Sequence, residues 1–170
     1  MRDWVVGGAV IEGELLAPFA PAGGVLLVEN RRWGGSTDWT TPGGVIDPGE
    51  EVLAGLTREV REETGLEVLR WGGMLYGIVA EAPGLGWRLH VEVHRAAEVV
   101  GDLKIGGDPD GIVVGAEWAD DLRCVECLDE SHQWVREPLL EWVGERFEEP
   151  REFRYRIEGE RLSDLLCVRT

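Results

Sequence analysis

Basic residues are scarce in this sequence of 170 residues, where 17 lysines and arginines stand against 33 aspartates and glutamates, a formal net charge of −16. A nucleic-acid surface needs a basic stripe and an anionic membrane attracts basic segments, so we expect neither as a partner. The overall field also repels small anions. If the ligand is a phosphate compound, local basic groups or a bound metal ion must hold it.

Long apolar runs are missing as well. No stretch approaches the roughly 20 apolar residues that a membrane-spanning helix needs. Near the N-terminus a short apolar run is flanked by Asp3 and Glu12, a pattern unlike a signal peptide. We therefore expect neither a membrane anchor nor an export signal.

Cysteine is rare, with three residues in the chain. An odd number of cysteines without an export signal favours reduced thiols and a cytoplasmic location. Cys124 and Cys127 form a CxxC pair with His132 nearby, but a structural zinc site normally uses two such pairs. We expect inert thiols here in preference to a zinc or redox centre.

The hydrophobic fraction of 44% is sufficient for one globular domain, and the sequence contains no repeat. Alternating and β-branched stretches predict strands over residues 5–13, 23–33, 66–82, 87–99, 111–119 and 151–159. Helical spacing predicts helices over 50–64 and 131–147, with Pro138 bending or splitting the second. Between them we expect a loop over 34–44, a turn over 107–111 and a short acidic segment after 119. This order predicts an α/β fold in which a mixed sheet lies between helices.

The first predicted helix carries acidic residues at its unfavourable end. Gly65 is expected to end the helix, so that Glu59, Glu62 and Glu63 lie in its last two turns. There the macrodipole favours cations by about 0.3–1 kcal/mol per side chain. Glu59 and Glu63 lie one turn apart at the border of the apolar stripe, with Glu62 beside them. Two carboxylates about 5 Å apart repel by roughly 3 kcal/mol at an effective dielectric constant near 20.

Such a cluster is suited to divalent cations, and oxygen ligands favour Mg²⁺ or Mn²⁺ over zinc. The alternative is a solvated acidic face. The spacing from Gly44 onward reads Gly44, five residues, Glu50, seven residues, Arg58–Glu59–Val60, one residue, Glu62–Glu63, one residue, Gly65–Leu66. All nine specified positions match the signature GX5EX7REUXEEXGU, where U is aliphatic, and chance agreement is on the order of 10⁻⁷ per starting position. The pattern favours the metal site.

This segment resembles the conserved box of the Nudix hydrolases. The WTTPGG run at 39–44, the Glu117–Trp118 pair and the PLLEWV run at 138–143 are similar to that family in layout. The resemblance implies a Nudix-type α/β/α sandwich, with a single domain over residues 1–147. Residues 148–170 lie outside it, and we expect them to form a β-hairpin that packs on the domain or on a partner in a homodimer, with a turn at Glu158–Gly159.

The resemblance also implies an activity, the Mg²⁺- or Mn²⁺-dependent hydrolysis of a diphosphate linkage. The substrate would be a small molecule, a nucleoside diphosphate joined to another group, and water would attack phosphorus. The metal would be held by Glu59, Glu62, Glu63 and the carbonyl of Gly44. Arg58 would orient the catalytic glutamates while paired with Glu50, because an unpaired guanidinium would compete with the metal for the carboxylates.

The general base differs between members of this family. Here the candidates are Glu62, Glu63 or a later carboxylate, among which Glu117 is our first choice before Asp108, Asp110, Asp120 and Asp121. For the substrate, a nucleotide sugar, an ADP-ribose-like compound and a nucleoside triphosphate all stay open. Trp33 or Trp39 is a candidate for stacking on a nucleobase, and the candidates for meeting phosphates are Arg31, Arg32, Arg88 and His90.

Two other functions are compatible with this fold. A non-catalytic nucleotide-binding sensor typically lacks box glutamates, and this chain has all of them. An RNA-decapping enzyme fits poorly with a charge of −16 and no basic stripe. The pyrophosphohydrolase is therefore the leading prediction.

Overall fold

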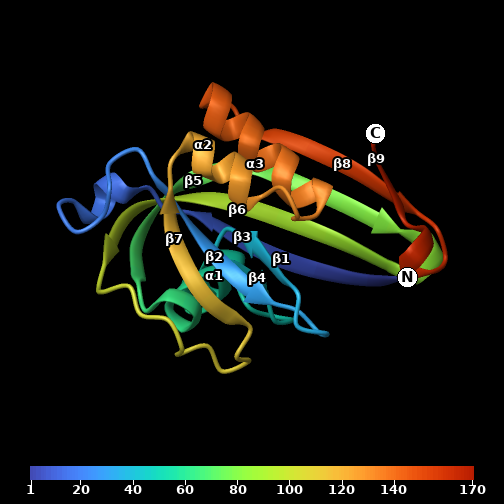
Figure 1. Cartoon of the computed structure of the whole chain (residues 1–170), viewed down its shortest axis with the longest axis horizontal. Helices are drawn as coiled ribbons and strands as arrows, with labels where there is room; N and C mark the ends of the chain where they lie inside the picture. The colour runs from blue at the N-terminus through green and yellow to red at the C-terminus, as the bar shows by residue number, and fades with distance from the viewer.

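The computed structural model describes residues 1–170 and contains two β-sheets with helices on both sides (Figure 1). The elements are β1 (Arg2–Val10), β2 (Val25–Arg31), β3 (Thr37–Thr40), β4 (Gly43–Val45), α1 (Val52–Thr64), β5 (Glu67–Ala82), β6 (Trp87–Val100), β7 (Val113–Ala119), α2 (Asp121–Cys127), α3 (Gln133–Glu145), β8 (Arg151–Glu158) and β9 (Leu166–Arg169). Short 3₁₀ turns lie at Gly13–Leu16, Pro83–Leu85 and Leu162–Asp164. No helix is both long enough and apolar enough to cross a bilayer.

The larger sheet has six strands in the order β4-β1-β6-β5-β8-β9, and the smaller has three in the order β3-β2-β7. In the larger sheet β1 runs parallel to β6 and β5 runs parallel to β8, whereas the other pairs are antiparallel. The predicted α/β class with a mixed sheet between helices is confirmed. The strands divide between two sheets, where the sequence predicted one.

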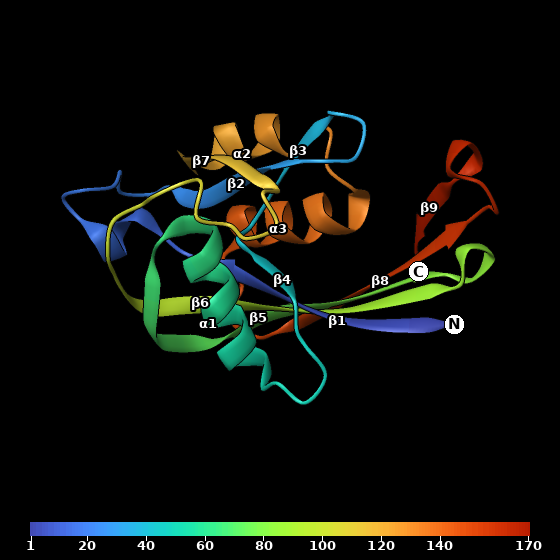
Figure 2. The same ribbon diagram turned by 90° about the horizontal axis from the view of Figure 1, so that it is seen from below.

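The alternation of side chains along the strands separates two hydrophobic cores. Ala9 of β1 packs with Leu56 and Val60 of α1 on one face, whereas Val10 packs with Leu139 of α3 on the other. All of these side chains are at most 1% exposed, and full burial of a leucine or valine stabilises the fold by roughly 1.5–3 kcal/mol. Helix α1 therefore covers one side of the strands, and α2 and α3 cover the opposite side (Figure 2).

Most predicted elements are present, with corrections in three places. The predicted loop over 34–44 contains β3 and β4, because the outer edge of β2 pairs with Thr37–Thr40. The acidic segment after residue 119 forms α2, whose first turn is capped by Asp120 through the N–H of Arg123 at 2.8 Å. Pro138 does not split α3, which is continuous over Gln133–Glu145.

The C-terminal strands extend the larger sheet. Strand β8 pairs with β5 in parallel register, Ile78 opposite Phe153, and β9 folds back antiparallel to β8. Phe153, Tyr155 and Ile157 are at most 2% exposed and belong to the α3 core. The tail is thus part of the sheet of its own chain, and its role in a homodimer stays a prediction.

Candidate active site

Helix α1 places its carboxylates at one edge of a cleft. The helix ends at Gly65, whose φ of 75° lies in the left-handed region and whose N–H donates to the carbonyl of Arg61 at 2.9 Å. The predicted end of the helix is therefore confirmed. Because Leu56 and Val60 are fixed in the core, Glu59 and Glu63 are turned toward β4 and the loop before it.

Glu63 is a buried carboxyl group, with the residue only 8% exposed. Its Oε2 accepts the N–H of Gly43 at 3.0 Å, and no cationic side chain contacts it. Burial raises the pKa of Glu63 to about 8, and the negative charges of Glu59 and Asp108 add to this rise. Without a bound cation the group is therefore largely protonated at neutral pH.

Glu59 lies against the backbone of Gly44. A Cβ atom on residue 44 would lie 2.6 Å from Oε2 of Glu59, so that a larger residue would displace this carboxylate from its position. Burial raises the pKa of Glu59, although a hydrogen bond from Arg58 opposes the rise. Two neighbouring box carboxylates thus have pKa values shifted upward by removal from water.

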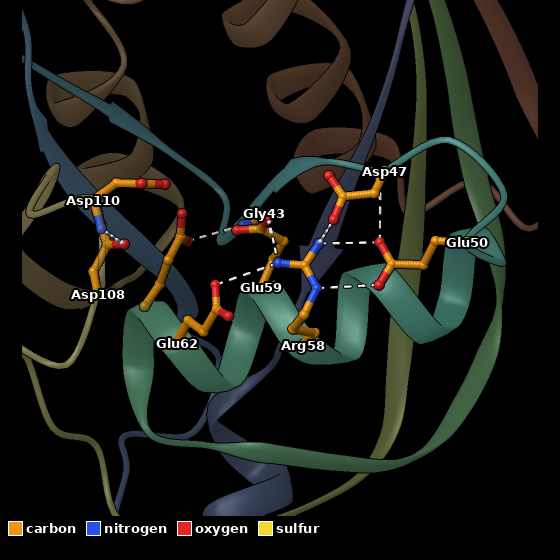
Figure 3. A network of polar contacts seen from close by, with 9 residues as sticks. Gly43, Asp47, Glu50, Arg58, Glu59, Glu62, Asp108 and Asp110 are labelled. Carbon is orange, nitrogen blue, oxygen red and sulfur yellow. Dashed lines mark hydrogen bonds and ion pairs between the residues drawn. The ribbon is translucent and has the colours of Figure 1, made fainter.

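Arg58 joins four acidic side chains on the outer side of α1 (Figure 3). Its Nε and Nη2 donate to the two oxygens of Glu50 at 3.1 and 3.0 Å, a bidentate pair. Its Nη1 donates to Glu59 at 3.0 Å and to Glu62 at 3.3 Å. The hydrogen bonds from Arg58 lower the pKa of Glu50. The ion pair between Arg58 and Glu50 that the resemblance implied is present.

Two further carboxylates come from the loop before β7 (Figure 3). Both oxygens of Asp108 accept backbone N–H groups, those of Asp110, Ile112 and Val113, at 3.0–3.1 Å, and so hold the loop in shape. The carboxylate of Asp110 has no hydrogen-bond partner within the protein. Both aspartates line the same cleft as Glu59 and Glu63.

The cleft has a volume of about 850 Å³ and lies between the larger sheet, β3 and the start of α3. Its acidic end is formed by Glu59, Glu63, Asp108 and Asp110. Its aromatic lining includes Trp4, Trp87, His132 and Trp134. Sequence reasoning missed these aromatic residues, although the alternation along β6 places Trp87 on the same face as Val91 and Val93.

Several predicted site residues lie elsewhere. Glu117 is bonded to Arg123 at 2.5 and 3.2 Å and does not line the cleft, and neither do Glu62, Asp120 or Asp121. The two tryptophans proposed for stacking are also outside it. Trp33 is fully exposed at the turn after β2, and Trp39 packs against the α3 core.

Among the basic candidates for phosphate, only Arg32 lines the cleft. Arg88 is paired with Glu81 at 2.8 Å, and His90 lies 3.5 Å from Asp3. Arg31 is exposed at the end of β2. The sequence could not predict which of these four basic residues lines the cleft, because that depends on which face of each strand meets α3.

The donor set fits a hard divalent cation, because a buried carboxyl group without a cationic partner, Glu63, lies beside Glu59 and the Gly43–Gly44 backbone. The structure does not assemble a closed ligand set, since no three acidic, histidine or cysteine side chains converge on one point. Glu59 and Glu62 are both bonded to Arg58 in this arrangement. The cysteines offer no second site, because burial raises the pKa of both the Cys124 and the Cys127 thiols.

Comparison with known proteins agrees with this geometry. The NUDIX domain profile matches residues 13–143. Nudix hydrolase 10 of Arabidopsis thaliana is 46% identical over 50 residues, which cover 26% of this chain and 18% of that protein. The matched part is thus a small fraction of the plant relative.

Two solved structures are similar over most of their length. A MutT protein from Methanosarcina mazei superimposes with a TM-score of 0.66 at 20% identity, covering 86% of this chain and 97% of that one. A MutT NUDIX hydrolase from Burkholderia pseudomallei superimposes with a TM-score of 0.65 at 22% identity, covering 82% of this chain and 97% of that one. At these identities the likeness concerns the fold.

Proposed function

Because this chain belongs to the NUDIX domain family, we propose that it is a pyrophosphohydrolase that cleaves a diphosphate linkage in a nucleoside diphosphate derivative. The observation that carries the proposal is a pair of carboxyl groups withdrawn from water, Glu63 buried and Glu59 partly buried, at the edge of a cleft large enough for a nucleotide. Burying acidic groups in this way is unfavourable unless the protonated form or a cation compensates for it. A solvated acidic face would show neither the burial nor the raised pKa values.

The residues that would hold Mg²⁺ or Mn²⁺ are Glu59, Glu62, Glu63 and the Gly44 carbonyl. When bound, such a cation neutralises charge on phosphate oxygens and makes coordinated water more acidic. Glu59 and Glu63 are restrained by their contacts with the Gly43–Gly44 backbone. That restraint is the positioning on which phosphoryl-transfer catalysis depends.

Arg58 and Glu50 act as positioning residues. The bidentate pair fixes the guanidinium, whose remaining nitrogen reaches Glu59 and Glu62. Neither Arg58 nor Glu50 lines the cleft, so they act on the substrate through the carboxylates. Loss of the pair would free Arg58 to compete with a cation for Glu59 and Glu62.

For the general base we favour Asp110 over Glu117. Asp110 lines the cleft and its carboxylate has no partner within the protein, whereas Glu117 is occupied by Arg123 outside the cleft. A carboxylate oxygen of Asp110 would accept the proton of the attacking water. The Asp108 loop holds Asp110 at the acidic end of the cleft.

The first test is a phosphate-release panel with Mg²⁺ over nucleotide sugars, ADP-ribose, dinucleoside polyphosphates and nucleoside triphosphates. We expect turnover on at least one class, and Glu63→Gln should reduce it by orders of magnitude with the fold intact. Nucleotide binding without turnover on any class would replace the proposal by a non-catalytic sensor. Activity of Glu63→Gln within a few-fold of wild type would refute its assignment as a metal ligand.

The second test compares two carboxylates. Asp110→Asn should lower kcat by about 10²–10⁴-fold, the usual contribution of a general base, while Glu117→Gln should leave it nearly unchanged. Circular dichroism spectra of both variants control for folding. The reverse order of effects would return the role of base to Glu117.

A further inference from the structure

Asn30 is the only asparagine of the chain, and it lies in β2 on the wall of the cleft, 5% exposed. Its Nδ2 donates to Thr40 Oγ1 at 2.9 Å, to Asp38 Oδ1 at 3.3 Å and to the Asp38 carbonyl at 3.4 Å. Three oxygens surround this nitrogen, so the opposite orientation of the amide would place oxygen against oxygen. The orientation of the side chain is therefore fixed by its surroundings.

The surroundings of Asn30 are themselves held in place. Asp38 lies directly opposite Asn30 in the β2–β3 ladder. Arg32 donates to both oxygens of Asp38, from Nε at 2.7 Å and from Nη2 at 2.9 Å. This bidentate ion pair is a rigid support, because the planar guanidinium matches the carboxylate.

The oxygen of the same amide is free. No donor of the protein reaches Asn30 Oδ1. This oxygen is not fully enclosed, because the one enclosed side-chain nitrogen or oxygen atom that makes no hydrogen bond is Nε of Arg88, which forms an ion pair with Glu81. Asn30 Oδ1 is thus open to the cleft. A hydrogen-bond acceptor beside the Asp38 carboxylate repels phosphate and sugar–phosphate oxygens, and it suits a ligand with a donor.

A flat aromatic surface lies in the same cleft. The rings of His132 and Trp134 are stacked with centroids 4.2 Å apart and an interplanar angle of 8°, and Trp87 meets Trp134 edge to face. The Ser131 hydroxyl donates to the Trp39 carbonyl at 2.6 Å and so ties the start of α3 to β3, the strand that carries Asp38. His132 is an exposed residue, yet packing around its ring lowers its pKa, which favours the neutral form that stacks on another ring.

From these contacts we propose that Asn30 is a specificity-determining residue, whose Oδ1 accepts a hydrogen bond from an N–H group of a nucleobase. The base would lie against the His132–Trp134 surface, and the inference rests on the nucleotide substrate proposed above for this cleft. A base without an N–H donor would displace water from Oδ1 and leave the acceptor unpaired. Because every common nucleobase carries an N–H donor, the selection depends on where on the base that donor lies.

Equilibrium binding of nucleoside monophosphates, which contain no diphosphate linkage, measures this selection without turnover. Calorimetry with AMP, GMP, CMP and UMP in Mg²⁺ identifies the preferred base. The matched ligand lacks an N–H donor on its base. It is purine riboside monophosphate for AMP, the pyrimidin-2-one analogue for CMP, the N3-methylated nucleotide for UMP, or 1-methylinosine monophosphate for GMP. We expect wild type to bind the donor-bearing nucleotide about five- to tenfold more tightly than its matched ligand, the range of one neutral hydrogen bond.

In Asn30→Ala the ratio of the two affinities, for the donor-bearing nucleotide and for its matched ligand, should fall to about one. Arg32→Ala releases Asp38 without touching the amide and should reduce the preference partially. Gln133→Ala removes the only glutamine amide of the chain, which is bonded to Glu137 outside the cleft lining, and should keep the full preference. An unchanged preference in Asn30→Ala overturns the proposal, and so does a nucleotide whose affinity depends on its ribose hydroxyls alone.

A spectroscopic readout guards against loss of folding in the variants. Asn30 and Gln133 give the only two carboxamide NH₂ signals of the protein, so ¹⁵N correlation spectra of wild type report on Asn30 directly. We expect its NH₂ signals to move with the preferred nucleotide and to move less with the matched ligand, while those of Gln133 stay in place. Unmoved Asn30 signals at saturation, or no binding of any nucleotide, overturn the inference. Binding with this preference but without hydrolysis would overturn only the proposed catalytic function.

Discussion

Replacing Glu63 by glutamine should stabilise the metal-free protein at neutral pH while it removes activity. The glutamine amide can still accept the N–H of Gly43, the bond that Glu63 makes at 3.0 Å, but it cannot ionise. The stability of wild type depends on the ionisation of this buried group, whose pKa is about 8 in the folded protein against 4.5 for an unperturbed glutamate. The variant therefore removes the free-energy cost of keeping an ionisable group buried, while the side chain keeps nearly the same size and packing.

The sign follows from proton linkage. Below pH 4.5 Glu63 is protonated in both states and carries no penalty. Between pH 4.5 and 8 the unfolded chain releases the proton while the folded protein retains it, so the free energy of unfolding falls as pH rises. At 1.36 kcal/mol per pH unit, the three units between pH 4.5 and 7.5 predict a loss of about 4 kcal/mol in the free energy of unfolding.

The assay is urea unfolding of wild type and Glu63→Gln in EDTA at pH 4.5, 6 and 7.5. We expect the variant to be more stable by about 2–4 kcal/mol at pH 7.5 and nearly equal at pH 4.5. In thermal melts this corresponds to roughly 5–15 °C for a chain of this size. Other titrating groups cancel in the difference between the two proteins at each pH.

Glu67→Gln is the matched control, because Glu67 is exposed at the start of β5 and makes no side-chain hydrogen bond or ion pair. Its stability difference from wild type should not depend on pH. If the stability difference for Glu63→Gln were equally flat, or if the variant were less stable at pH 7.5, the argument from burial would be refuted.

Four further outcomes follow from the same contacts. Millimolar Mg²⁺ should raise the melting temperature of wild type by mass action, and that of Glu63→Gln less; an unchanged wild-type melt would oppose the site. Gly44→Ala places a Cβ 2.6 Å from Glu59 Oε2 and should lower kcat/KM about 100-fold in steady-state assays, whereas a fully active variant would refute the tight contact. Arg58→Lys retains the charge but loses the bidentate pair, so kcat should fall about tenfold or more, and wild-type kcat would remove its positioning role. Deleting 148–170 removes β8 from the side of β5 and three core side chains, so the product should not fold, as judged by circular dichroism; light scattering of the full chain decides whether it is a dimer.

The helix and its carboxylates could be predicted from sequence because both depend on local geometry. A period of 3.6 residues places Glu63 at the border of the stripe formed by Leu56 and Val60, and Gly65 ends the helix wherever the rest of the chain lies. Burial of Glu63 follows from that border position once the helix packs on β1.

The choice between Asp110 and Glu117 could not be made in this way. It depends on the path of the loop before β7, which is fixed by three backbone N–H groups bonded to Asp108. It also depends on Arg123, which lies six residues beyond Glu117 and occupies its carboxylate from α2. Tertiary structure decides which carboxylate is paired with an arginine. The sequence pattern alone therefore leaves Asp110 and Glu117 as equal candidates for the general base.

The excess of acid in the sequence left two ways of holding a phosphate, local basic groups or metal. In the cleft Arg32 is the one arginine or lysine of the lining, and its Nε and Nη2 both donate to the carboxylate of Asp38. Arg58 lies outside the lining and is bonded to three glutamates. A phosphate chain that enters this cleft therefore meets carboxyl groups and an arginine that is already neutralised. We infer that its affinity depends steeply on the divalent cation, because no other positive charge is free to receive it.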